Sequence, residues 1–179
     1  MPKYYSKREL LLRGIWSLFE FITFSYSPRL LYGWRNFILR VMGAKIGVGV
    51  KIYPSARIMY PWLLEVGKGT TISWNVKIYN LGKTRIGNNT MISQYAHLCG
   101  GTHDYTSGNF ELLRTGLIIG DNVWIAADSF IGPGVIVNDG SLVAARSVVI
   151  KNVESGMIVG GNPAREIGKL ERPYNHRLV

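Results

Sequence analysis

Aliphatic residues recur at every sixth position through most of the chain. Fifteen Ile, Val or Leu residues follow this step: Ile46, Ile52, Ile58, Val66, Ile72, Ile78, Ile86, Ile92, Leu98, Ile119, Ile125, Ile131, Val137, Val143 and Val149. A helix repeats its faces every ~3.6 residues and a strand every ~2, so neither predicts this spacing. A three-sided parallel β-coil does, because each face contributes one inward aliphatic side chain per turn.

Four positions after most of these aliphatics stands a small or β-branched residue. The thirteen residues are Val50, Ala56, Thr70, Val76, Thr90, Ala96, Thr102, Val123, Ser129, Val135, Ser141, Ser147 and Val153. Their restricted size predicts a corner at each of these positions, where the chain turns from one face of the coil to the next.

The repeat is interrupted three times. The step lengthens from six to eight residues between 58 and 66 and between 78 and 86, and to twenty-one between 98 and 119. Each interruption follows the third face of a coil, so all three are expected to stack at one corner. The longest predicts a protruding loop over residues 99–118, and a long loop in a tight solenoid is usually functional.

The first 45 residues follow a different pattern. Apolar residues recur there at steps of three and four: Leu11, Ile15, Leu18 and Ile22, then Leu30, Leu31, Trp34, Ile38 and Val41. The stretch from Ser25 to Pro28 separates the two runs, which predicts two short amphipathic helices. Such helices would cap the open end of the solenoid, pack against another subunit or lie on an anionic membrane surface. The sequence leaves these roles open.

Positive charge is concentrated in the same segment. The chain carries 21 Lys and Arg against 11 Asp and Glu, and residues 1–45 account for +6 of the net +10. Charged residues interrupt the apolar runs well before the ~20 residues that a membrane span needs. No secretory signal pattern is present, so we expect the segment to be retained and the protein to be cytoplasmic, with peripheral contact at the inner face of the membrane as an alternative.

The composition is typical of a single globular domain. The 179 residues are 47% hydrophobic and 18% charged. The one cysteine, Cys99, cannot form an internal disulfide and is expected to be a buried corner residue. Nucleic-acid binding is not expected, because the charge lies on the predicted helices without a DNA- or RNA-reading motif.

Several motifs resemble those of a known family. The chain reads IGDNVWI over 119–125, PG over 133–134, SVV over 147–149 and GNPA over 161–164. With the six-residue repeat, these motifs resemble the left-handed β-helix acyltransferases, in the branch of maltose, galactoside and exopolysaccharide O-acetyltransferases. The loop sequence GTHDY over 101–105 is similar to the acetyltransferases of capsule and colanic-acid-type polysaccharide synthesis.

The resemblance implies an all-β fold, a left-handed parallel β-helix over residues 46–167. A short N-terminal α-helical segment (1–45) precedes it, the loop 99–118 protrudes from it, and a C-terminal tail (168–179) follows. The implied function is acetyl-CoA-dependent O-acetylation of a saccharide in polysaccharide biosynthesis, by a homotrimer that requires no metal. The alternatives are an amino-sugar N-acetyltransferase and a non-catalytic scaffold, although a scaffold would not need the long loop.

Acyl transfer to a hydroxyl needs a base near neutral pH, and histidine, with a pKa of about 6.5, is the natural side chain. His97 lies inside a regular repeat and His176 in the tail, whereas His103 lies on the loop. His103 is therefore the candidate general base, at the position where the family places its base. The three histidines lack the paired spacing of the β-helix carbonic anhydrases, so a zinc site is not expected.

The resemblance also implies residues that bind acetyl-CoA: Trp124, Ala127, Ala145, Lys151 and Arg165. The two alanines would lie along the pantetheine arm and the two basic residues near the phosphates. Trp124 would contact the cofactor or pack against a neighbouring subunit.

Candidates for the acceptor site are Ser73, Asn75, Asp104 and Tyr105. The maltose and galactoside enzymes use an Asn one coil before the base, where this chain has Ser73, with Asn75 two residues later, so that contact is in doubt. Tyr105 offers a stacking face to a sugar ring. Asp104 would contact the acceptor or orient the imidazole of His103.

Overall fold

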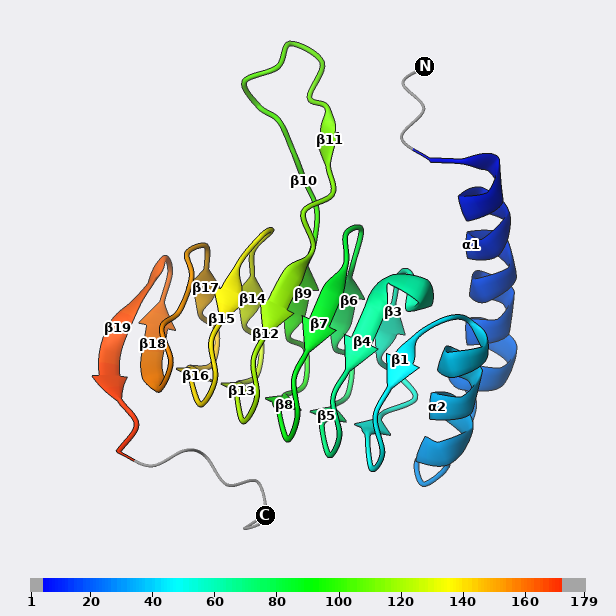
Figure 1. Cartoon of the computed structure of the whole chain (residues 1–179), viewed down its shortest axis with the longest axis horizontal. Coiled ribbons are helices and arrows are strands. Elements are labelled where there is room, and N and C mark those ends of the chain that lie inside the picture. Colours follow the sequence, from blue (N-terminus) through cyan, green and yellow to red (C-terminus); the bar gives the residue numbers. More distant parts are fainter. Residues whose placement is uncertain (1–4, 172–179) are drawn as a thin grey trace.

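The computed structural model describes residues 5–171 and shows a parallel β-helix with helices packed against one end (Figure 1). The predicted fold class is confirmed. Each turn places one short strand on each of three sheets, here called faces A, B and C. Face A contains β1 (Lys45–Ile46), β4 (Leu64–Val66), β7 (Thr84–Ile86), β12 (Leu117–Ile119) and β15 (Ile136–Val137).

Faces B and C continue each turn. Face B contains β2 (Lys51–Ile52), β5 (Thr71–Ile72), β8 (Met91–Ile92), β13 (Trp124–Ile125), β16 (Leu142–Val143), β18 (Met157–Gly161) and β19 (Ala164–Lys169). Face C contains β3 (Arg57–Ile58), β6 (Lys77–Tyr79), β9 (His97–Cys99), β14 (Phe130–Ile131) and β17 (Val148–Val149). Strands pair in parallel between successive turns, except that β19 folds back antiparallel on β18.

The six-residue repeat forms the core. All fifteen aliphatics are at most 8% exposed, and they stack in register, as Ile52, Ile72 and Ile92 do on face B. Burial of each such side chain contributes about 1.5–3 kcal/mol. Twelve of the thirteen small residues are also buried. Thr102 is the exception, so the prediction of a corner at this position is wrong. The chain has already left face C there, and Thr102 lies exposed on the loop.

The three interruptions all lie between face C and face A, at what we call the C–A corner, as predicted. The first contains η2 (Pro61–Leu63), and the third contains β10 (Thr102–His103) and β11 (Leu112–Leu113). Successive turns are linked at this corner. The Asn80 side chain accepts a hydrogen bond from Tyr60 N (3.0 Å) and donates one to Tyr60 O (2.7 Å).

The N-terminal segment folds as two helices. α1 (Lys7–Phe19) continues into a π-helical turn, η1 (Glu20–Phe24), and α2 (Tyr32–Val41) follows the predicted break. Ser6 caps α1, since its hydroxyl accepts a hydrogen bond from Glu9 N at 3.1 Å. Within residues 5–171, no helix has the length and apolar character needed to cross a membrane.

The helices cap the first turn of the solenoid. With no turn before it, the first turn has strand edges whose peptide groups lack strand partners. Four helix side chains donate to its carbonyls: Trp16 Nε1 to Ile58 O (2.7 Å), Arg35 Nε to Ile52 O (2.6 Å), Asn36 Nδ2 to Val50 O (2.8 Å) and Arg40 Nη2 to Ile46 O (2.8 Å). Capping is thus one role of this segment, and it explains part of its basic character.

The opposite end is formed by the hairpin of β18 and β19. The expected C-terminal tail starts at residue 168, while β19 runs to Lys169. Residues 172–179, including His176, lie outside the described part of the chain.

Candidate functional site

The loop of residues 99–118 forms a β-hairpin that projects away from the C–A corner (Figure 1). β10 pairs antiparallel with β11, and His103 lies opposite Leu112. At the base of the hairpin, Arg114 Nε donates to Leu81 O at 2.8 Å, and its guanidinium forms an ion pair with Glu9 of α1. The hairpin is therefore anchored to the neighbouring turn and to the cap.

His103 is exposed on this hairpin with a defined ring orientation. Its Nδ1 lies 2.7 Å from the carbonyl oxygen of Phe110, two residues before β11. A carbonyl oxygen only accepts hydrogen bonds, so in the neutral imidazole Nδ1 carries the proton and Nε2 keeps its lone pair. This is the tautomer that a general base needs. Phe110 is held in the left-handed region (φ 48°), an uncommon conformation for a bulky residue.

Asp104 and Tyr105 lie at the distal part of the hairpin. Asp104 Oδ1 accepts hydrogen bonds from Thr106 Oγ1 (2.6 Å), Thr106 N (2.9 Å) and Ser107 N (3.3 Å). These bonds, led by the Thr106 hydroxyl, lower the pKa of the Asp104 carboxyl. The observed partner of the His103 ring is the Phe110 carbonyl, and Asp104 accepts its hydrogen bonds from Thr106 and Ser107 at the hairpin tip. Tyr105 is 84% exposed.

Two of the predicted acceptor residues and two of the predicted cofactor residues lie at the corner between faces B and C, here called the B–C corner. Ser73 and Asn75 line a shallow cavity of about 510 Å³ with Trp74, Gln94 and Tyr95. Ala127 and Ala145 occupy the same corner in two later, successive turns, where Arg146 N donates to Ala127 O at 2.9 Å. At this corner Ala127 is half-buried and Ala145 is exposed.

Trp124 lies on the outer side of face B, half-buried between Met91 and Leu142. Its indole Nε1 donates to the Ser93 hydroxyl at 2.9 Å. The ring is therefore fixed on the surface of the solenoid. Both cofactor contact and packing against another subunit are compatible with this position.

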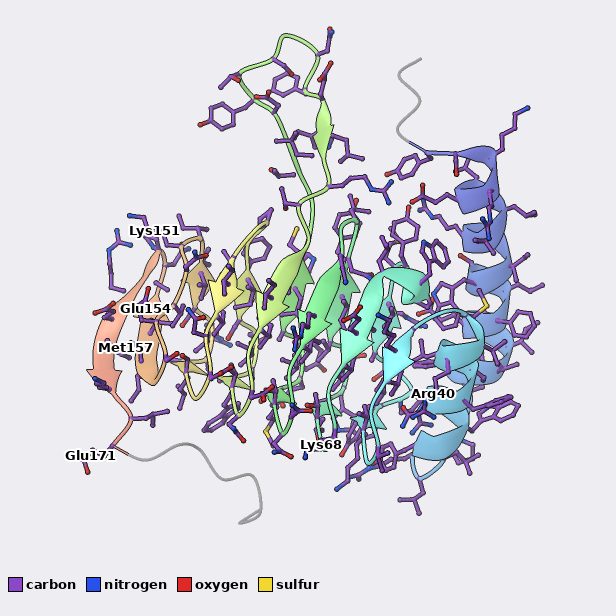
Figure 2. All side chains as sticks on the ribbon, viewed as in Figure 1. Arg40, Lys68, Lys151, Glu154, Met157 and Glu171 are labelled. Carbon is purple, nitrogen blue, oxygen red and sulfur yellow. The ribbon has the colours of Figure 1, made fainter. Side chains whose placement is uncertain are left out.

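Lys151 and Arg165 line a single cavity of about 480 Å³ at the C-terminal end of the solenoid. Lys151 follows β17, and Arg165 lies on β19. Figure 2 shows Lys151 on the same edge of the solenoid as the hairpin. Glu166 also lines the cavity. Two cations around one cavity suit a phosphorylated ligand.

The structure therefore places the predicted site residues in separate groups rather than in one site. His103, Asp104 and Tyr105 are on the hairpin at the C–A corner, whereas Ala127 and Ala145 are at the B–C corner. These corners are opposite edges of face C. A single chain does not place the base beside the proposed cofactor arm.

Two contacts of the candidate site had no signal in the sequence. The carbonyl of Phe110 orients His103, but a backbone acceptor can be any residue. The pair of Arg114 and Glu9 joins positions 105 residues apart. Only the folded chain brings either contact together.

His97 and Cys99, the other residues considered for catalysis, contact neighbouring residues of the fold. His97 packs its ring edge-to-face against Phe130 at 5.4 Å. Cys99 is half-buried rather than buried as expected, because it ends β9 at the base of the hairpin, and its thiol donates to Gly101 O at 3.3 Å. Within residues 5–171, no group of three or more His, Cys, Asp or Glu side chains is arranged to hold a metal ion.

His97 is expected to make stability depend on pH. Burial, together with the neighbouring Lys77, lowers the pKa of His97 below 6.5. As the pH falls, His97 binds a proton in the unfolded chain before it does so in the folded chain. His97 therefore leaves the free energy of unfolding unaffected above about pH 6.5 and lowers it as the pH falls from there through the folded-state pKa. The melting temperature, measured at about pH 7.5 and about pH 5.5, should drop less in His97→Gln than in the wild type. Equal drops would contradict this assignment.

Comparisons with known proteins agree with this architecture. Residues 116–151 match the family model described as bacterial transferase hexapeptide (six repeats). A protein of Escherichia coli named as a colanic acid biosynthesis acetyltransferase, WcaF, is 40% identical over 164 residues, covering 92% of this chain and 90% of the relative. The chain belongs to the hexapeptide-repeat acetyltransferases.

More distant members of the hexapeptide-repeat acetyltransferases share the whole fold. Galactoside O-acetyltransferase of Escherichia coli is 26% identical, covering 94% of this chain and 83% of its own length. A hexapeptide-repeat acetyltransferase of Vibrio cholerae superposes with a TM-score of 0.85 at 26% identity, covering 93% of this chain and 95% of that one. Its complex with acetyl coenzyme A gives a TM-score of 0.84 at 24% identity, covering 93% and 91%.

Proposed function

We propose that this acetyltransferase transfers the acetyl group of acetyl-CoA to a hydroxyl of a saccharide in polysaccharide biosynthesis. The relative named for colanic acid biosynthesis and the galactoside O-acetyltransferase support this substrate class. The observation that carries the proposal is the hydrogen bond from His103 Nδ1 to Phe110 O (2.7 Å), which leaves Nε2 as an open base on a protruding hairpin.

The role proposed for His103 is to move one proton. Acetyl-CoA supplies an activated thioester, so no covalent enzyme intermediate is needed. Nε2 of His103 accepts the proton of the sugar hydroxyl as its oxygen attacks the acyl carbon. The new C–O bond forms, the C–S bond breaks, and the imidazolium returns the proton to the departing thiolate. The Phe110 carbonyl stabilises the imidazolium through the Nδ1 proton.

The residues of the proposed cofactor site lie on both edges of face C, with Lys151 at the C–A corner and Ala127 and Ala145 at the B–C corner. Lys151 and Arg165, which share a cavity, bind the phosphate groups. Backbone groups beside Ala127 and Ala145 hydrogen-bond the pantetheine arm, and Trp124 contacts it from the outer side of face B. On the acceptor side, Tyr105 stacks on the sugar ring. The polar atoms of Ser73, Asn75 and Asp104 are further acceptor contacts in this proposal.

The proposed active site lies between copies of the chain. The hairpin and the B–C corner are on opposite edges of face C, so a hairpin reaching a neighbouring copy would complete the site. A ring of three copies repeats this contact three times and closes on itself. We therefore propose a homotrimer as the active form.

Titration of the purified protein with acetyl-CoA tests the cofactor site without knowledge of the acceptor. We expect micromolar binding, about −8 kcal/mol. The double variant Lys151→Ala, Arg165→Ala should weaken it about tenfold or more, because each charge-assisted contact contributes about 1.5–3 kcal/mol. Lys68→Ala, an exposed lysine at the far end of the solenoid, is the matched control. No detectable heat, or equal weakening by the control, would contradict the proposed site.

The same preparation separates O-acetylation from N-acetylation. Neutral sugars and amino sugars are supplied as acceptors, and the acetylated product is treated with mild alkali. An ester releases acetate under these conditions and an amide does not. Products found only as alkali-stable amides would overturn O-transfer and leave an amino-sugar N-acetyltransferase.

A further inference from the structure

α1 and η1 turn a regular apolar stripe away from the solenoid. Leu11, Ile15, Leu18 and Ile22 follow helical spacing, yet they are 65%, 39%, 59% and 59% exposed. The opposite side of the same segment, with Trp16 and Phe24, packs on the first turn. Capping therefore does not account for the stripe.

The exposed apolar surface is concentrated here. Thirteen of the twenty-two exposed large hydrophobic residues belong to this segment, and together they define the outer helical face: Leu10, Leu11, Ile15, Leu18, Phe19, Phe21, Ile22, Tyr26, Leu30, Leu31, Trp34, Phe37 and Val41. Contiguous apolar surface on this scale marks an interaction site rather than scattered exposure. Figure 2 shows side chains projecting from both helices on the side away from the β-strands.

Direct contacts join the two helices into one surface. Trp34 Nε1 of α2 donates to Thr23 O of η1 at 3.1 Å. On the outer helical face, Phe21 contacts Tyr26 with ring centroids 5.3 Å apart, and Trp34 stacks on Phe37 at 6.2 Å. Aromatic rings of this kind favour the boundary between water and lipid.

The charges around the outer helical face have one sign. Lys7 and Arg8 are exposed beside it, and Lys7 lies one helical turn before Leu11. Arg29 is turned to the solenoid, where it donates to the Tyr53 hydroxyl at 2.9 Å. Between residues 5 and 64 the only carboxylates are Glu9 and Glu20. Both are turned inward: Glu9 pairs with Arg114, and Glu20 lies 3.9 Å from Arg57 and accepts from Ile58 N.

We propose that the outer helical face docks on an anionic lipid bilayer, with α1 and α2 lying in the interface. An anionic bilayer offers both apolar contact and negative charge, which complement the apolar side chains and the basic residues of this face. A symmetric contact with a second copy would instead place Lys7 and Arg8 against a face without carboxylates. The proposal goes beyond the acetyltransferase function and does not depend on the acceptor.

Co-sedimentation of the full-length protein with vesicles tests the docking. We expect pelleting with phosphatidylcholine vesicles that contain phosphatidylglycerol, little pelleting with phosphatidylcholine alone, and weaker binding as NaCl is raised. Leu18→Glu should lower the partition coefficient about tenfold or more, because it places a carboxylate in the apolar contact. The double variant Lys7→Glu, Arg8→Glu should lower it by a similar factor.

Ile167→Glu is the matched control, since it makes the same kind of change at a residue that is 64% exposed on β19. It should bind vesicles as the wild type does. The circular dichroism spectra of all variants should match the wild type, because every substituted side chain is exposed. Absent pelleting with anionic vesicles, or Leu18→Glu binding as well as Ile167→Glu, would overturn the proposal. So would lipid-free self-association that Leu18→Glu abolishes and Ile167→Glu retains, because a second copy would then cover this face.

Discussion

His103→Ala is expected to lower the rate of acetyl transfer by about 10² to 10⁴-fold. The variant removes Nε2, the nitrogen left unprotonated by the hydrogen bond from Nδ1 to Phe110 O. Water then has to accept the hydroxyl proton, and it is a far weaker base than imidazole. The rate is measured as release of free CoA thiol at saturating acetyl-CoA and acceptor.

Two controls distinguish a loss of catalysis in His103→Ala from a folding defect. His103 is exposed, so His103→Ala should retain the wild-type melting temperature and the affinity for acetyl-CoA. Thr102→Ala changes the neighbouring exposed residue of the same strand and should retain the wild-type rate. A rate unaffected by His103→Ala would remove this residue from the mechanism.

Trp16→Ala is expected to lower the free energy of unfolding by about 3–5 kcal/mol. The side chain is 2% exposed, contacts Phe24 edge-to-face at 5.9 Å and donates its indole N–H to Ile58 O. Truncation leaves a cavity beneath α1 and a carbonyl of the first turn without its donor. Denaturant titration followed by circular dichroism measures the loss.

Two further variants divide this effect. Trp16→Phe keeps most of the apolar contact but loses the donor, so it should cost about 1–3 kcal/mol. Leu18→Ala, two residues along the same helix on its exposed side, should change stability by at most about 0.5 kcal/mol. If Trp16→Ala cost no more than Leu18→Ala, the helices would not stabilise the solenoid as a cap.

The sequence carries enough information for the solenoid but not for its cap. The six-residue step identifies Ile52, Ile72 and Ile92 as one inward row because the interior imposes the same requirement in every turn. The orientation of α1 is different. Its apolar stripe does not show which surface Leu11 and Leu18 meet. In the structure, an unpaired carbonyl of the first turn favours a donor, Trp16, on the side of α1 that packs against the solenoid. This unpaired carbonyl is present only once the first turn has formed.

The candidate site divides in the same way. His103 stands out in the sequence because it lies on an insertion in a regular repeat. Thr102 fits the repeat by spacing but lies outside the solenoid, since spacing alone does not show where the chain leaves face C. The Phe110 carbonyl and the pair of Glu9 with Arg114 depend on backbone geometry and on contacts between distant segments, neither of which has a residue pattern.

The capped first turn also limits how copies of this chain can associate. An uncapped β-helix ends in three parallel strand edges, each able to extend onto the end of another copy, and a head-to-tail contact of that kind grows into a filament. Side chains from α1 and α2 occupy those edges with bonds such as Arg35 to Ile52 O and Asn36 to Val50 O. Axial growth by strand pairing is thereby blocked at this end.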